Sequence, residues 1–114
     1  MKAGAQAEQT AAQYLQRQGL QLLQSNYRCR FGEIDLIMKE RDTLVFAEVR
    51  LRSRSEFGGA AASIDARKQH KLILAAQHYL STVSPMPACR FDAVLLSSAE
   101  GKEGIEWLKN AFQL

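Results

Sequence analysis

The stretch GEIDLIMKERDTLVFAEVRLR, residues 32–52, limits the possible folds of this chain more than any other. It holds two apolar runs, 33–39 and 43–51, joined by a short polar turn, which predicts a β-hairpin. Glu33, Asp35 and Glu48 interrupt the apolar runs. A strand buried on both faces would carry apolar side chains at these positions. The fold or the function therefore has to account for three carboxylates.

Other segments supply helices and strands around the hairpin. Helical spacing of apolar residues predicts helices over 3–18 and 64–82, the second capped by Ser63. Three more apolar runs predict strands: 20–27, 89–97 and 105–108, the last followed by a helical or frayed tail. A helix between the third and fourth strands can connect parallel neighbours. The order predicts an α/β fold, a mixed β-sheet flanked by helices, in one domain spanning residues 1–114.

Composition and charge narrow the class of protein. Hydrophobic residues make up 46% of the chain, enough for a core, but no apolar run is long enough to span a bilayer. The first residues lack the apolar stretch of a signal peptide, so we expect a cytoplasmic protein without membrane contact. The net charge is +3, and basic residues gather in mid-chain around the carboxylates. This pattern favours binding to a phosphate polymer.

The hairpin geometry predicts that two of the carboxylates meet. Counting outward from a turn centred on 41–42, Asp35 lies opposite Glu48 and Glu33 lies opposite Arg50. Directly opposed residues share a face of the sheet, with Cβ atoms roughly 4.5–5.5 Å apart. The turn ERDT lacks the Asn-Gly or Asp-Gly signature that fixes a hairpin register. A one-residue slip, which would move the pairing, stays open.

Two interpretations of the acidic positions remain at this point. The carboxylates could form the solvated face of an antiparallel hairpin, because such sheets commonly alternate in this way. However, Ile37 shares the parity of Asp35, and Leu44 and Phe46 share that of Glu48. Both faces of the sheet therefore look covered beyond its acidic end. The second interpretation places the carboxylates at one end of a buried sheet.

Opposed carboxylates at the end of a buried sheet suit a divalent cation. Two like charges directly opposite each other destabilise a hairpin, and a cation between them converts the repulsion into attraction. Mg²⁺ prefers oxygen ligands, often one or two carboxylates, and completes its shell with water and phosphate oxygens. Arg50, on the same face as Glu48, could hold that phosphate. These residues favour a metal-dependent reaction at a phosphate group.

The combined motifs resemble a known family. GEIDLI, the spacing from Asp35 to Glu48, EVRLR, FGGAAAS and RFDAV are similar to the YraN-like family of uncharacterised bacterial proteins. The resemblance covers most of the chain. It implies a restriction-endonuclease-like fold, the PD-(D/E)xK class, similar to the archaeal Holliday-junction resolvases. An acid at the end of one strand, followed by Glu-x-Lys on the next, is the nuclease motif of that class.

The resemblance assigns roles to individual residues. Asp35 and Glu48 take the places of the two acids that bind Mg²⁺ or Mn²⁺. Glu8 and Glu33 become additional metal ligands. The remaining candidates are basic: Arg50 and Lys68 as catalytic residues, and Arg50, Arg52, Arg54, Lys68 and Lys71 as DNA contacts. Glu48 is thus the acid of a Glu-x-Arg rather than a Glu-x-Lys sequence.

Arg50 departs from the motif and leaves three readings open. The motif lysine is thought to position or activate the attacking water, whereas arginine stays protonated at working pH and is a poor proton shuttle. The metal alone could activate water, Lys68 could reach in from the second helix, or the protein could bind without cutting. We therefore expect a metal-dependent endonuclease acting on DNA, with branched DNA as one candidate substrate, as a homodimer. The alternative is a non-catalytic DNA-binding module with the nuclease fold.

Overall fold

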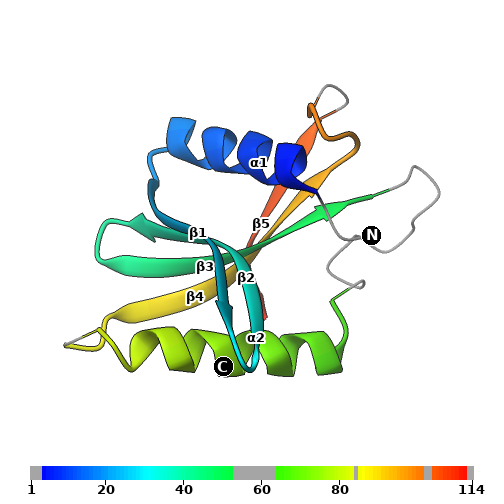
Figure 1. Cartoon of the computed structure of the whole chain (residues 1–114). Helices are drawn as coiled ribbons and strands as arrows, with labels where there is room; N and C mark the ends of the chain where they lie inside the picture. The colour runs from blue at the N-terminus through cyan, green and yellow to red at the C-terminus, as the bar shows by residue number, and fades with distance from the viewer. Residues whose placement is uncertain (1–3, 53–63, 84, 102–103, 113–114) are drawn as a thin grey trace.

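The computed structural model describes residues 4–52, 64–83, 85–101 and 104–112 and arranges them in three layers (Figure 1). A five-stranded sheet forms the middle layer, and one helix packs on each of its faces. The elements in chain order are α1 (Ala5–Arg17), β1 (Gln21–Cys29), β2 (Gly32–Glu40), β3 (Thr43–Leu51), α2 (Ala66–Leu80), β4 (Ala88–Leu96) and β5 (Ile105–Phe112).

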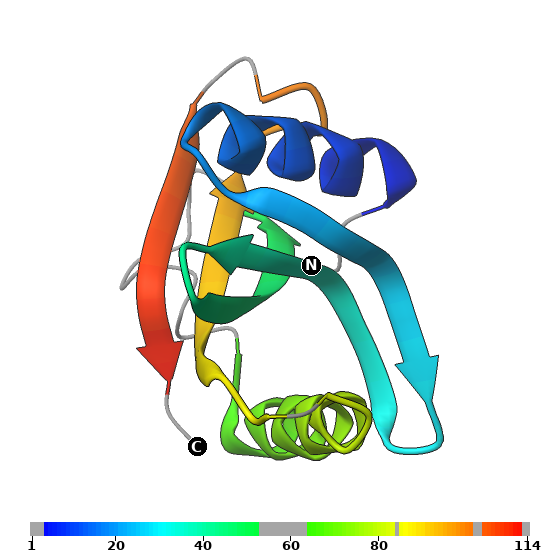
Figure 2. The ribbon, with the colours of Figure 1, turned by 90° about the vertical axis from the view of Figure 1, so that its left-hand side faces the viewer.

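The strand order β1-β2-β3-β4-β5 places the predicted hairpin at the centre of the sheet. β2 and β3 are antiparallel, and their register runs from Glu40↔Thr43 to Leu36↔Ala47, as predicted. β3 and β4 are parallel and α2 connects them, which confirms the mixed sheet and the helical crossover. Figure 2 shows how the β1–β2 hairpin curves away from α1 and ends beside α2. The edge of the sheet formed by β1 and β2 thus runs from the layer of α1 to the layer of α2.

The two sheet faces hold separate apolar cores. Three alanines and Leu15 place the buried stripe of α1 against one face, and Leu72, Ala76 and Leu80 place that of α2 against the other. Such stripes are typical of helices packed on a sheet. Neither helix, at 13 and 15 residues, is long and apolar enough to cross a membrane. The carboxylates described below lie on α1 and on the central strands β2 and β3.

Two boundaries differ from the prediction. The second helix starts at Ala66, and Asp65 caps it by accepting the Lys68 backbone N–H at 2.8 Å. Asp65 is therefore the cap, while Ser63, the predicted cap, lies outside the described residues. The expected helical tail is also wrong. The last strand continues to Phe112, whose ring stacks on Phe91 with centroids 4.6 Å apart, and this stacking buries Phe112.

Candidate metal centre

Asp35 marks the point where β2 and β3 separate. Their pairing ends at Leu36↔Ala47, one step before the predicted Asp35–Glu48 pair. Instead of a backbone carbonyl, the Asp35 carboxylate accepts the Val49 backbone N–H through Oδ2, at 2.9 Å. Asp35 is 1% exposed and Glu48 3% exposed, so the solvated-hairpin interpretation is wrong for both. Asp35 is therefore a buried acid that its hydrogen bond holds in place where the β2–β3 pair ends.

Three carboxylates converge at this point from two layers of the structure. Oxygen atoms of Glu8, Glu33 and Asp35 all lie within 4.8 Å of one another. Glu8 comes from the first turn of α1 and is 7% exposed. Glu33 pairs with Arg28 of β1 in the sheet, and the Arg28 Nε lies 3.1 Å from its Oε2. The sheet register therefore places Glu33 opposite Arg28, whereas the sequence had predicted Arg50.

Burial and the nearby Asp35 carboxylate raise the pKa values of two acids here, Glu8 and Glu48. Burial, followed by the charge of Asp35 and a hydrogen bond to it, raises the pKa of Glu8. Burial and then a hydrogen bond and charge from Asp35 raise the pKa of Glu48 to about 8, although Lys68 and Arg50 act in the opposite direction. Both shifts mean that a proton, or another cation, stabilises the cluster. Glu48 joins the three acids through its hydrogen bond to Asp35.

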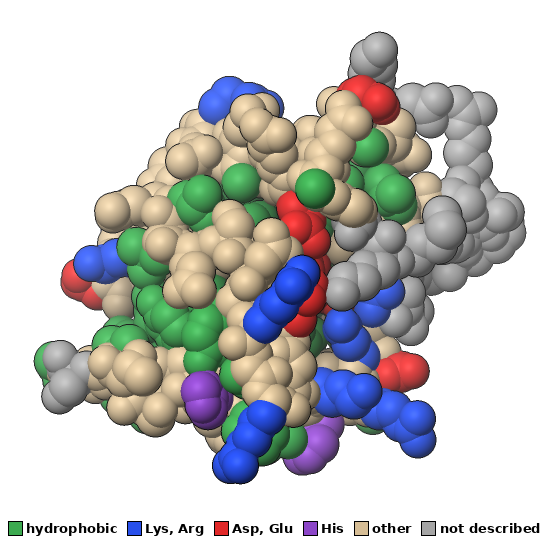
Figure 3. Space-filling model, viewed as in Figure 1, with side chains coloured by type: hydrophobic (Ala, Val, Ile, Leu, Met, Phe, Trp, Pro, Cys, Tyr) green, Lys and Arg blue, Asp and Glu red, His purple; other side chains and the backbone are tan. Residues whose placement is uncertain are grey.

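Two cations meet Glu48 on its other side. Arg50 Nη2 lies 3.5 Å from Glu48 Oε2, and Lys68 Nζ lies 3.3 Å from the same oxygen. Lys68 comes from the first turn of α2, so the opposite helical layer contributes it. Figure 3 shows acidic side chains near the middle of this molecular face, with Lys and Arg side chains beside and below them. The centre thus combines a carboxylate cluster with adjoining positive charge.

The other predicted DNA contacts are Arg52, Lys71 and Arg54. Arg52 forms an ion pair with Glu106 of β5. Lys71 is exposed on α2, beside Gly32 at the start of β2. Arg54 lies outside the described residues. The structure thus brings Glu8, Glu33, Asp35, Glu48, Arg50 and Lys68 together and leaves Arg52 and Lys71 at the periphery.

Asn26 is part of this centre and was missed by the sequence reasoning. Its side-chain amide donates to Glu8 and lowers the pKa of that acid. Its neighbours Ser25 and Tyr27 pair with the residues on either side of Asp35. Asn26 has φ +55°, a left-handed conformation that asparagine adopts more readily than most residues. The available signal was an asparagine inside a strand-like run, where it is normally depleted.

Comparison with known proteins decides the family. The model of "Uncharacterised protein family UPF0102" matches residues 7–96. The chain belongs to this family. UPF0102 proteins from Nitrosomonas europaea, Methylobacillus flagellatus and Psychromonas ingrahamii are 62%, 57% and 54% identical to it. Each alignment covers 96% of this chain, and 92%, 95% and 88% of the respective relative.

The UPF0102 match includes the whole candidate centre. Residues 7–96 run from before Glu8 to beyond Lys68, and they also contain Asp35, Glu48 and Arg50. The resemblance to the YraN-like proteins is thereby confirmed as membership of UPF0102. The family's description names no reaction, so a function has to be argued from the geometry of the centre.

Proposed function

We propose that this UPF0102 protein is a metal-dependent DNA endonuclease with a restriction-endonuclease-like fold, similar in action to Holliday-junction resolvases. The observation that carries the proposal is the position of Asp35. It lies at the end of a central strand pair, within 4.8 Å of two other acids and hydrogen-bonded to Glu48. Next to these acids lie Arg50 and Lys68. Acids for a metal beside cations for a phosphate suit phosphodiester hydrolysis.

The residues present fit Mg²⁺ or Mn²⁺. Three carboxylates within 4.8 Å supply the oxygen ligands that these ions prefer. Glu8 and Glu48 have raised pKa values because of burial and the nearby charge of Asp35, so a divalent cation would relieve their repulsion. Asp35, Glu8 and Glu33 would hold the ion, with Glu48 completing the set. When bound, the ion neutralises phosphate charge and makes water more acidic.

The basic side chains have separate tasks in this proposal. Arg50 is 13% exposed and lies beside Glu48, where its planar guanidinium can bind two phosphate oxygens. Lys68 carries a primary amine, which can gain and lose a proton more readily than a guanidinium. It therefore takes the position that the motif lysine would otherwise occupy. In its ion pair with Glu48, Lys68 is an ammonium that orients the attacking water, and Arg50 stabilises charge in the transition state.

DNA is the proposed substrate, and two copies of the chain would act together. Two symmetric cuts in a branched DNA need two active sites, which a two-fold homodimer provides. Lys71 and Arg52 extend the positive surface beyond the centre. They contact phosphates and fix the orientation of the substrate without reading its sequence.

A cleavage assay tests the proposal. Purified protein is incubated with Mg²⁺ or Mn²⁺ and a four-way junction, a flap or a linear duplex. We expect cleavage of at least one substrate, abolished by EDTA and by Asp35→Asn. The matched control is Asp42→Asn, an exposed acid in the β2–β3 turn, which should cut like the wild type. If the folded wild type binds DNA but cuts none of these substrates with either metal, the endonuclease proposal is wrong.

A second candidate function rests on Arg50. Its place in Glu-x-Arg, with the guanidinium 3.5 Å from Glu48, favours phosphate binding over proton transfer. The protein would then be a DNA-binding module that keeps the nuclease fold. Its DNA affinity would fall steeply with salt, would not need a metal and would survive Asp35→Ala. Metal-stimulated binding that Asp35→Ala abolishes would contradict this candidate.

A further inference from the structure

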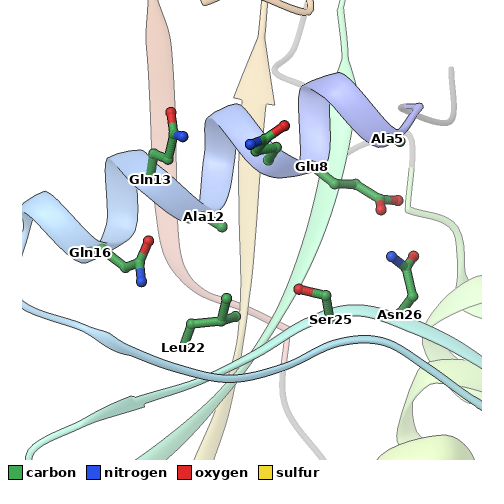
Figure 4. A pocket seen from close by; sticks show the side chains of 9 residues that line it. Ala5, Glu8, Ala12, Gln13, Gln16, Leu22, Ser25 and Asn26 are labelled. Carbon is green, nitrogen blue, oxygen red and sulfur yellow. The ribbon is translucent and has the colours of Figure 1, made fainter.

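A cleft of about 310 Å³ opens between α1 and β1, directly beside the carboxylate cluster (Figure 4). Glu8 and Asn26, which hydrogen-bond to each other, both line it. Its volume lies at the lower end of the range of about 300–1,000 Å³ in which proteins hold small ligands. The cleft therefore has room for one flat group of modest size, next to the site where the phosphate is proposed to lie.

The lining of the cleft is polar at its walls and apolar between them. Gln9, Gln13 and Gln16 line it from α1, at spacings that place them along one helical face. Ser25 and Asn26 line it from β1 and project toward α1, while Gln16 projects toward the strand (Figure 4). Between the walls lie Ala12 and Leu22, which also belong to the apolar core under α1. A flat ligand would lie on the apolar part and hydrogen-bond at its edges.

These side chains favour an uncharged heterocycle over an anion. Each glutamine or asparagine offers both donors and an acceptor, which match the mixed pattern on the edge of a nucleobase. Glu8 is the charged residue among the described residues that line the cleft, and its negative charge opposes a phosphate or carboxylate. Amide side chains can pair with any of the four bases. The cleft therefore suits base binding with little sequence preference.

We propose that this cleft holds one unpaired nucleobase of a DNA strand whose adjacent phosphate lies at the carboxylate centre. The inference rests on the proposed function and names its substrate class: DNA with an extrahelical or single-stranded nucleotide. A base inside a duplex has its faces covered by stacking and its edge covered by pairing. Only a base outside the helix can enter between α1 and β1. Moving a base out of the helix costs less free energy when that base is already unstacked. Damaged or branched DNA is therefore the preferred substrate.

Binding measurements separate the cleft from the chemistry. Fluorescence anisotropy compares three labelled DNAs: a paired duplex, the same duplex with one unpaired nucleotide, and the same bulge with an abasic residue. Each is titrated with the full chain in EDTA and again in Ca²⁺. The test variant is Gln9→Leu/Gln16→Leu, in the cleft. The matched control is Gln6→Leu/Gln18→Leu, two exposed amides of the same helical region that do not line it. Leucine preserves helix propensity in both.

We expect the wild type to bind the bulged duplex about tenfold more tightly than the abasic one, the scale of a few buried hydrogen bonds. The preference should disappear in Gln9→Leu/Gln16→Leu and persist in the control. Equal affinity of the wild type for base and abasic DNA would overturn the inference, as would a preference retained by the cleft variant. Base preference without any cleavage would refute the endonuclease proposal alone. Cleavage without base preference would refute the cleft alone.

Discussion

Lys68 of α2 and Glu48 of β3 form an ion pair of 3.3 Å across the junction of two structural layers. The partner oxygen, Glu48 Oε2, also lies 3.5 Å from Arg50. A lysine amine therefore reaches the acid of the Glu-x-Arg sequence, although the chain has no lysine two residues after that acid. Helix α2 supplies the group that the strand lacks, which makes the role of Lys68 separable from that of Arg50.

Replacing Lys68 by methionine should reduce cleavage strongly and DNA affinity weakly. If Lys68 assists proton transfer, the loss in kcat is about 10²–10⁴-fold. Lys71→Met is the matched control, because Lys71 is exposed on the same helix, three residues on. It should weaken DNA binding slightly and more at low salt, with kcat unchanged. Single-turnover cleavage assays check both variants, and equal losses in the two would rule out a special role for Lys68.

Glu8→Gln should weaken the binding of Mn²⁺ measured by isothermal titration calorimetry. The variant removes one charge from three acids that lie within 4.8 Å. Loss of a group that only hydrogen-bonds to a metal ligand weakens metal affinity about 10–100-fold. Loss of a direct ligand should therefore weaken the affinity at least about tenfold. Glu100→Gln, an exposed acid far along the chain, should bind like the wild type. A Glu8→Gln protein with unchanged affinity would exclude Glu8 from the metal shell.

Stability without metal should fall between pH 5 and pH 8. In the folded protein burial and Asp35 raise the pKa of Glu48 from 4.5 to about 8. The folded state then keeps a proton that the unfolded state releases, so the free energy of unfolding decreases as pH rises through this window. Thermal melts at each pH should show a smaller decrease for Glu48→Gln. Mg²⁺ should raise the wild-type Tm most at pH 8, where the carboxylates are most charged.

Asp92→Ala should destabilise the sheet by about 3 kcal/mol, because it removes one member of a buried ion pair. Asp92 is fully buried and accepts hydrogen bonds from Arg90, the Trp107 indole and the Asn110 backbone. Urea denaturation followed by the single tryptophan, Trp107, measures the effect. Glu106→Ala, which breaks the exposed pair with Arg52, should cost about 1 kcal/mol or less. Similar losses in both variants would contradict a structural role for Asp92.

Much of the fold followed from local patterns in the sequence. The β2–β3 register was predicted by assuming a two-residue turn at Arg41 and Asp42, although the turn sequence itself left a one-residue slip open, and the structure has the predicted register. Arg41 adopts φ +55°, so the turn forms without the usual glycine. The tail was mispredicted because the stacking of Phe112 on Phe91 depends on residues 21 positions apart. Such contacts leave no local periodicity.

The candidate site was only partly predictable, for a related reason. Strand alternation brought Asp35 and Glu48 to one place, since both belong to a single hairpin. The approach of Glu8 and Lys68 depends on how two helices pack, and spacing alone does not determine that. Arg28, and not the predicted Arg50, lies opposite Glu33. The reason is that β2 separates from β3 at Asp35, while its pairing with β1 continues. Asn26 was missed because its role appears only in that geometry.

The position of β4 has a consequence for the order of events during protein synthesis. Every residue of the carboxylate centre precedes residue 69, yet β3 is flanked on one side by β2 and on the other by β4, which begins at Ala88. On the ribosome, β3 therefore emerges with one edge unpaired. It gains its parallel neighbour only when most of the chain has been made. We expect the nascent chain to carry all the acids but no assembled centre, so the centre forms only near the end of translation.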